Sequence, residues 1–443
     1  MKIAHGLFVY GACSALAVGM MAGCSRGGKS SGEERPPAYV RQTVPDAENA
    51  YPLWTNAVAL AAFTSHDDWR MRGLFNVVCS FKTNMPDGVE GQSLAEMLAS
   101  RRAMFGLVSE ALALGRMQFP APKGIHEVGS GLMSGWVSLA NWMILDGRWG
   151  EADGDYLRAV RAYGGVCGMG RQMMAGEGNN IAYLIGSGLR MRGVSALRRL
   201  CAGDGPDADA MRHALTQIPE APAEDICLAQ TYRIEAGLIP SEDVVRRGHR
   251  TFGEWLASRL CGFKWVYDPA ATATLFDRAY ATYATNAMCT TWAACDRRLC
   301  AEIKNRMNVS GLDDMDDGLR DWVVWLRLAK ASRKEPNIVG VILSGWRLES
   351  ADSMLKNSFN TRTLVGLTRA FIALRITRKE TGAYPVSLDA AVAAGLLAGE
   401  PKDFFSGQPI RYSTERRLLW SVGEDGKDDD GDKRRDLILA LPE

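Results

Sequence analysis

Apolar residues recur at helical spacing through most of this chain, from about residue 46 onward. Long segments rich in Ala, Leu, Met and Arg alternate with short breaks at Gly, Pro and Asp, whereas the period-two alternation of strands is scarce between them. The segments that we expect to be helical are residues 47–63, 93–115, 131–145, 155–174, 181–200, 207–217, 274–303 and 318–330. Because no fixed repeat period is visible, the pattern predicts an irregular multi-helix, all-α body.

The strongest helical pattern lies in residues 354–380. Apolar residues recur on one face from Leu364 to Leu374, and basic residues gather near the C-terminal end, where the helix dipole favours them. Gly382 should end this helix, since glycine readily adopts the left-handed conformation found there.

The pattern changes after this helix. A short helix is expected at residues 387–394, with Ser387 as its N-cap. Three strand-like pieces follow, at residues 409–413, 417–422 and 436–441. The fold prediction is therefore a mainly α chain with a small C-terminal α+β unit.

The first residues form a separate pattern. Lys2 precedes an apolar stretch, and Met21-Ala22-Gly23-Cys24 places two small residues before a cysteine. This resembles a bacterial lipoprotein signal peptide, which implies cleavage before Cys24, acylation of Cys24 by palmitate-type chains and anchoring in the cell envelope, facing the periplasm. Ser25 favours the outer membrane. The alternatives are an ordinary secretory signal or an uncleaved membrane anchor. The apolar stretch is short for a membrane-spanning helix, and Gly and Ser residues lower its hydrophobicity.

The patterns together divide the chain into four parts. Residues 1–23 are the expected signal peptide, and residues 24–45, rich in Gly, Ser, Pro and charge, are an expected flexible tether. Residues 46–350 form the all-α body, and residues 351–443 form the long helix with the α+β unit.

Composition adds two limits. The 443 residues are 47% hydrophobic, so the chain can bury a large core, and the formal net charge is only +1, from 52 basic and 51 acidic residues. The net charge of the chain therefore does not favour binding to nucleic acid or to an anionic membrane surface. The expected partners are the membrane, through the lipid, and other envelope proteins.

Of the ten cysteines, Cys13 leaves with the signal and Cys24 would carry lipid. Eight remain, an even number that permits disulfides in an oxidising envelope. No C-x-x-C occurs, so the spacing favours one or more disulfides over a metal site. The alternative is that they are small buried hydrophobic residues with free thiols.

The C-terminal motifs are Ala383-Tyr384-Pro385, then Pro401-Lys402-Asp403-Phe404 and Gly407-Gln408-Pro409, then Ser421-Val422-Gly423-Glu424-Asp425-Gly426. In this order they resemble the C-terminal domain of type II secretion major pseudopilins. They also resemble the ending of uncharacterised bacterial envelope proteins with a helical body, which have no activity to transfer. Phe404 stands where a pseudopilin has Pro, and the pilin-type N-terminal helix is missing, so assembly into a pseudopilus is not expected.

The resemblance implies a calcium site in the loop before the last strand. The carboxylates that would form it are Asp425, Asp428, Asp430, Asp432 and Asp436. Calcium takes six to eight oxygen ligands and would relieve the repulsion among these groups. The spacing does not fit an EF-hand. The alternative is a solvated turn, neutralised by the neighbouring Lys and Arg residues, with no metal.

The helical body and the C-terminal unit carry no catalytic motif. From residue 46 onward the chain lacks H-E-x-x-H, a P-loop and G-x-S-x-G, and the histidines left after signal removal are isolated: His66, His126, His213 and His249. The glycines in residues 164–170 indicate a close helix crossing or a helix break more than a phosphate cradle. The acidic run at residues 313–317 could supply a general acid and base, but a helix N-terminus explains it as well.

Two functions remain open. The first is a non-catalytic, lipid-anchored envelope protein with a protein-interaction or structural role. The alternative is an envelope glycan or peptidoglycan hydrolase that uses a cleft in the helical body. Convergent carboxylates in a polar pocket would favour the hydrolase, and an apolar interior would favour the first function.

Overall fold

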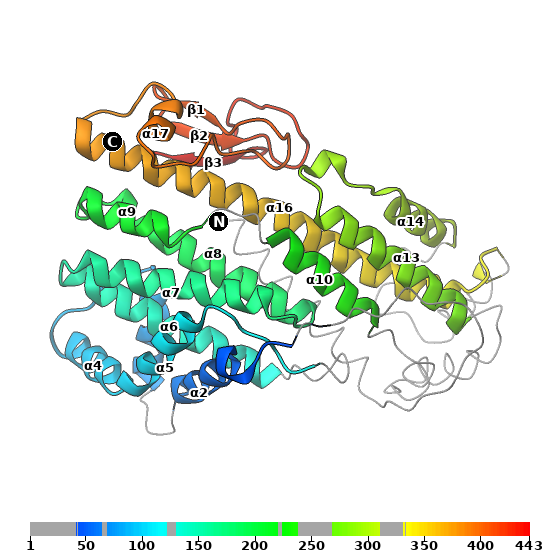
Figure 1. Ribbon diagram of the computed structural model, residues 1–443, viewed down its shortest axis with the longest axis horizontal. Helices are drawn as coiled ribbons and strands as arrows, with labels where there is room; N and C mark the ends of the chain where they lie inside the picture. The colour runs from blue at the N-terminus through cyan, green and yellow to red at the C-terminus, as the bar shows by residue number, and fades with distance from the viewer. Residues whose placement is uncertain are drawn as a thin grey trace.

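The computed structural model describes residues 41, 43–63, 69–121, 130–219, 224–237, 268–310, 331–332 and 334–443. Over these residues the chain is mainly helical, with one small antiparallel sheet near the C-terminus, which confirms the predicted fold class (Figure 1). Among the described helices, none combines the length and the apolar character that crossing a membrane requires. Cys24, the acidic run at residues 313–317, and His66, His126 and His249 lie outside the described residues.

A first group of helices packs at the N-terminal end of the described chain. After a 3-10 turn at Asp46–Glu48, it consists of α2 (Tyr51–Ala61), α3 (Trp69–Cys79), α4 (Gly88–Ala99), α5 (Arg102–Leu114), α6 (Ser130–Ala152), α7 (Tyr156–Ala175), α8 (Asn180–Ala202) and α9 (Ala208–Thr216). The segment expected as one helix at residues 93–115 is two helices, separated at Ser100 and Arg101. Helix α3 was not predicted.

Within this group α7 and α8 make the most extensive helix contact. A Cβ added to Gly170 would lie 2.4 Å from the carbonyl oxygen of Gly186, and one added to Gly193 would lie 2.7 Å from the amide nitrogen of Cys167. The close helix crossing predicted from the glycines is therefore confirmed, and no break occurs in α7.

A second group consists of α10 (Glu224–Gly237), α13 (Pro269–Ala287) and α14 (Arg298–Ser310). The segment expected as one helix at residues 274–303 is broken by a loop that contains a 3-10 turn at Trp292–Ala294. The side chain of Asn286 closes this loop, because it donates to the carbonyl of Asp296 and accepts from the amide of Asp296, each at 2.8 Å.

The long helix α16 (Ile338–Thr381) runs along both groups (Figure 1). Its first half packs in one apolar core with α10, α13 and α14, and its second half packs in another core with α8, α9 and the sheet. The helix starts at Ile338 rather than at residue 354, and it is continuous across residues 350 and 351, where we placed a domain boundary. Gly382 ends it at φ +82°, as predicted.

The C-terminal unit packs on the end of α16. It contains α17 (Asp389–Ala393), β1 (Arg411–Ser413), β2 (Leu418–Ser421) and β3 (Leu437–Ala440). The sheet order is β1-β2-β3, with Trp420 paired to Arg411 on one side and Ile438 on the other. All three predicted strands are present. Ser387 is not the N-cap of α17, because that position is Leu388, and the Ser387 hydroxyl lies instead 3.1 Å from the Asp389 carboxylate.

Candidate functional site

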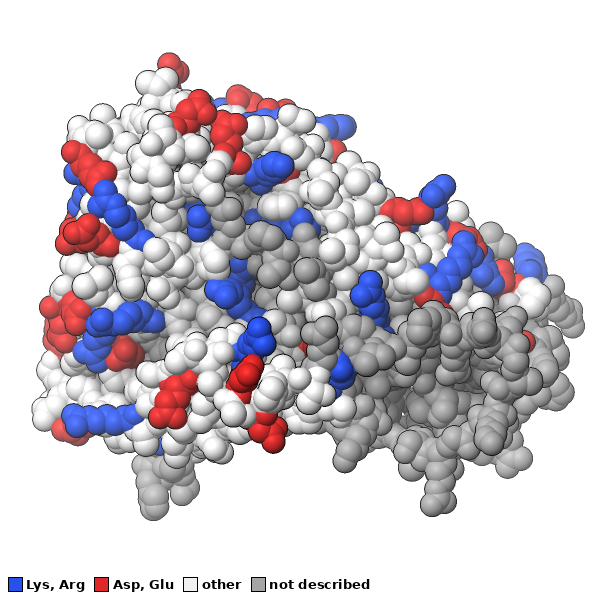
Figure 2. Space-filling view, in the orientation of Figure 1, with Lys and Arg blue, Asp and Glu red and all other residues white. Residues whose placement is uncertain are grey.

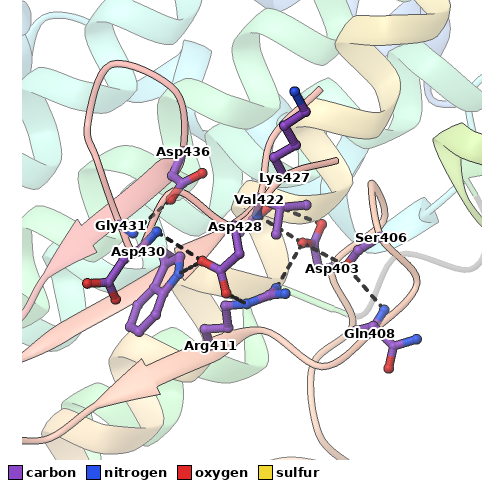
Figure 3. A network of polar contacts seen from close by, with 12 residues as sticks. Asp403, Ser406, Gln408, Arg411, Val422, Lys427, Asp428, Asp430, Gly431 and Asp436 are labelled. Atoms are coloured by element: carbon purple, nitrogen blue, oxygen red, sulfur yellow. Dashed lines mark hydrogen bonds and ion pairs between the residues drawn. The ribbon is translucent and has the colours of Figure 1, made fainter. Parts of the chain in front are cut away.

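The carboxylates predicted to bind calcium each contact a different neighbouring group of the chain (Figure 3). The Asp425 carboxylate accepts from the amide of Lys427, and that of Asp432 accepts from the amide of Arg434, both at 3.0 Å. Asp430 accepts from the Arg416 guanidinium at 2.7 Å. In the part of the chain that the structure describes, no three acidic, histidine or cysteine side chains converge as metal ligands.

Asp428 and Asp436 occupy opposite electrostatic environments. Asp428 accepts from the indole Nε1 of Trp420 at 3.0 Å and pairs with Arg411, and the Trp420 hydrogen bond holds the pKa of this carboxyl below its usual value of 3.8. Asp436 is buried and accepts from the amide of Gly431 at 2.7 Å, and burial raises the pKa of its carboxyl above 3.8. Ionisation is thus favoured at Asp428 and disfavoured at Asp436.

Two buried carboxylate oxygens in this loop, Asp429 Oδ2 and Asp436 Oδ1, have no hydrogen-bond partner. They are the acceptors best placed to take a cation, although Asp429 was not among the predicted ligands. Its other oxygen accepts from Arg435 at 3.0 Å. Because six or more oxygens are required and no three acidic side chains of the described loop converge, the loop is not a preformed calcium cage. Calcium binding here stays a prediction.

A second acidic residue of the C-terminal unit, Asp403, is fully buried. Its carboxylate accepts from the hydroxyls of Ser406 (3.0 Å) and Ser421 (2.9 Å) and from the amides of Phe405 (2.9 Å) and Val422 (3.1 Å). These bonds join the turn before β1 to the end of β2 (Figure 3). Asp403 thus has the hydrogen-bonding pattern of a structural carboxylate.

A groove of about 790 Å³ lies on the helical body. Its walls come from α4, α5, α6 and α7 and from the end of α9. The apolar part of the lining includes Leu98, Phe105, Leu112, Met143 and Trp149. We refer to this concavity as the arginine groove, because four arginines complete its lining: Arg102, Arg158, Arg161 and Arg171.

The charges of the arginine groove are unbalanced. Asp146 is the only acidic residue of its lining, and it pairs with Arg158 at 2.7 Å. Arg102, Arg161 and Arg171 are exposed, and among the described residues no carboxylate lies within 4.0 Å of their guanidinium groups. Elsewhere the charges are mixed, since Figure 2 shows basic and acidic side chains interspersed over the visible face.

Three glycines of α7 also line the groove. A Cβ added to Gly164 would lie 2.4 Å from the Gln217 side chain, and a Cβ on Gly165 or Gly168 would lie 2.7 Å from Met143 or Leu112, respectively. The glycines therefore make room for neighbouring side chains, and they do not form a phosphate loop.

The remaining candidates are isolated. The seven described cysteines are free thiols, so the expected disulfide is not formed in this structure. Cys79, Cys167 and Cys201 are buried, and burial raises the pKa of each thiol to about 12. They fit the alternative interpretation as small hydrophobic residues. His213 is exposed in the last turn of α9.

Comparisons of the chain with protein-family models, with curated proteins and with solved structures find no match.

Proposed function

We propose that this chain is a non-catalytic, lipid-anchored bacterial envelope protein, and that its helical body holds an acidic segment of a partner protein in the arginine groove. The observation that carries the proposal is the set of three guanidinium groups, of Arg102, Arg161 and Arg171, beside an apolar lining and without described carboxylates to neutralise them.

The size and chemistry of the groove support a binding role. Its volume of about 790 Å³ is sufficient for several side chains of a bound segment. Phe105 and Trp149 can pack against apolar side chains, while the arginines pair with carboxylates through charge-assisted hydrogen bonds. A segment that alternates acidic with aromatic or aliphatic residues complements both parts of the lining.

The groove supports the glycan-hydrolase alternative less well. Such an enzyme needs two carboxyl groups, roughly 5–9.5 Å apart, on either side of the scissile bond. The lining supplies Asp146 alone, already paired with Arg158. The acidic run at residues 313–317, which the alternative would use, lies outside the described residues.

The anchoring part of the proposal rests on the resemblance of Met21-Ala22-Gly23-Cys24 to a lipoprotein signal. In cells given a fatty-acid probe, the wild-type chain should incorporate the label and sediment with membranes. The Cys24→Ala variant should incorporate none. Unchanged labelling of that variant would overturn the lipid anchor and leave the groove proposal untouched.

The groove is tested with the purified full chain in detergent micelles. The probe is a fluorescent peptide in which Glu alternates with Phe and Leu, and the comparison peptide carries Lys in place of Glu. The acidic peptide should bind by fluorescence anisotropy, more weakly at high salt, and the basic peptide should not bind. The triple variant R102Q/R161Q/R171Q should weaken binding by tenfold or more, since a charge-assisted hydrogen bond contributes about 1.5–3 kcal/mol.

The matched control is R116Q/R278Q/R434Q, which removes the same charge at exposed positions outside the groove. It should bind the acidic peptide like the wild type. If both triple variants lose peptide binding equally, the loss comes from the change in net charge and not from the groove. Groove-dependent binding to phosphatidylglycerol vesicles without binding to the peptide would make the occupant a lipid and contradict the proposal.

A further inference from the structure

The loop between α13 and α14 carries two cysteines, Cys289 and Cys295. Hydrogen bonds of Asn286 to Asp296 draw the ends of the loop together, and the amide of Cys289 donates to the carbonyl of Asn286 at 3.0 Å. The loop is therefore a closed, internally bonded turn.

The two thiols lie beside each other inside this turn. The Cys289 sulfur lies 3.7 Å from the carbonyl of Ala294, the residue that precedes Cys295. The Cys295 sulfur in turn lies 3.7 Å from the carbonyls of Asn286 and Thr291. Each cysteine is half-buried.

The same loop contacts the C-terminal unit. The amide of Trp292 donates to the carbonyl of Phe404 at 2.9 Å, and the Trp292 ring packs edge-on against Phe405 and Phe359, with centroids 6.5 and 5.6 Å away. A Cβ added to Gly407 would lie 2.7 Å from the Thr291 side chain. The loop between the cysteines thus forms part of the contact between the helical body and the C-terminal unit.

We propose that Cys289 and Cys295 form a reversible disulfide that fixes this loop and so holds the C-terminal unit to the helical body. The oxidant is a donor disulfide, of a small thiol or of a thiol–disulfide oxidoreductase. One cysteine thiolate attacks it, forming a mixed disulfide and releasing one donor thiol; the other cysteine then attacks the mixed disulfide and releases the second. The two protein thiols lose two electrons and two protons, which the donor gains.

Access distinguishes this pair from the three buried cysteines. A shallow pocket of about 520 Å³ opens beside Cys295, lined by Ala294, Asp296, Arg297, Arg298 and Ala301. A donor disulfide can enter there. Cys79, Cys167 and Cys201, by contrast, are buried in the helical cores. The inference is independent of the arginine groove.

The test equilibrates the full chain with excess oxidised glutathione and traps remaining thiols with N-ethylmaleimide. Trypsin releases residues 279–297 as one peptide that holds both cysteines and no others. After oxidation this peptide should be lighter by two hydrogen atoms and carry no maleimide, and dithiothreitol should restore two alkylated cysteines. Two alkylated thiols after oxidation, or a bond from either cysteine to Cys300, would overturn the pairing.

Hydrogen exchange tests the mechanical role. Oxidation should slow exchange about tenfold or more in peptides that cover residues 289–295 and 403–408, because the closed loop opens less often. Cys295→Ser, treated with the same donor, should show no slowing, and Cys300→Ser should respond like the wild type. If the disulfide forms without changing hydrogen exchange in residues 403–408, it does not hold the C-terminal unit to the helical body, and this part of the proposal is wrong.

Discussion

Gly170 of α7 and Gly186 of α8 face each other without side chains where the two helices cross. A Cβ on Gly170 would lie 2.4 Å from both the carbonyl oxygen of Gly186 and the amide nitrogen of Arg190, and a Cβ on Gly186 would lie 2.7 Å from the carbonyl oxygen of Gly170. The obstacles are backbone atoms, which cannot turn aside as a flexible side chain can. The spacing of this helix pair therefore depends on the two glycines.

The first prediction is that Gly170→Ala destabilises the fold. The added methyl group forces α7 and α8 apart, at a cost of about 1–3 kcal/mol in the free energy of unfolding. Denaturant unfolding followed by circular dichroism measures it.

Gly188→Ala is the matched control, since Gly188 lies exposed on α8 with nothing within 4 Å of an added Cβ. It should leave the fold unchanged or stabilise it by about 0.5–1 kcal/mol, because alanine favours helices. If both variants unfold at the same denaturant concentration, the helix crossing is not limited by the glycines.

The second prediction concerns Asp403. Asp403→Asn replaces one acceptor oxygen by a donor amide group that faces hydroxyl or amide donors, so at least one buried hydrogen bond is lost. The cost should be about 2–3 kcal/mol, concentrated in the C-terminal unit. Hydrogen exchange over residues 401–422 measures it. The exposed Asp389→Asn in the same unit should show no change, and an equally inert Asp403→Asn would contradict the structural role.

The helices that sequence patterns located best are those with strong caps. The ends of α7, α8 and α9 lie within two residues of the predicted bounds, and each helix begins after a side chain that accepts from a first-turn amide: Asp155, Asn179 or Asp207. Such caps are local, so the sequence shows them directly. The early start of α16 was missed because residues 338–353 hold glycines and β-branched residues, which are weak helix formers.

Features that depend on distant contacts were not predictable. The break between α13 and α14 contains no Gly or Pro, and one of its main-chain bonds goes to Phe404, more than a hundred residues away. The arginine groove likewise draws its lining from five helices, so no spacing along the chain indicates it. Cys24 and residues 25–40 of the expected tether lie outside the described residues, and the lipid anchor stays a prediction. The described end of that segment is not free, because Arg41 pairs with Glu177 at 3.2 Å and the amide of Val44 donates to the Gln118 side chain at 3.0 Å.

The third prediction is a titration of Trp420. The pKa of Asp428 is held below 3.8, mainly by the hydrogen bond from the Trp420 indole, so its contribution to stability is present above pH 3.8 and is lost as pH falls through the lowered value. The Trp420 Nε1 proton resonance should move in this acidic range. In Asp428→Asn this movement should vanish. If the resonance titrates identically in the variant, the Asp428 carboxylate is not the group that Trp420 senses, and the prediction is wrong.

The last prediction is calcium binding in the loop from Asp425 to Asp436. An ion would satisfy the unpartnered oxygens of Asp429 and Asp436, and it would recruit Asp425 from its bond with the Lys427 amide. Because Asp436 must ionise to bind, and burial favours its protonated form, affinity should weaken as pH falls through its raised pKa. Calorimetric titration of the chelator-treated chain should then release heat at millimolar calcium, and hydrogen exchange should slow over residues 409–441 while the helical body stays unchanged.

Asp425→Ala should weaken this binding, and Asp389→Ala, an exposed carboxylate of the same unit outside the loop, should not. The competing interpretation is a turn neutralised by its own ion pairs, with Arg411, Arg416 and Arg435 already bound to Asp428, Asp430 and Asp429. In that case calcium must compete with three guanidinium groups that are covalently part of the chain and always charged. Absence of heat at millimolar calcium, together with an Asp425→Ala variant that melts like the parent, would establish the ion-paired turn.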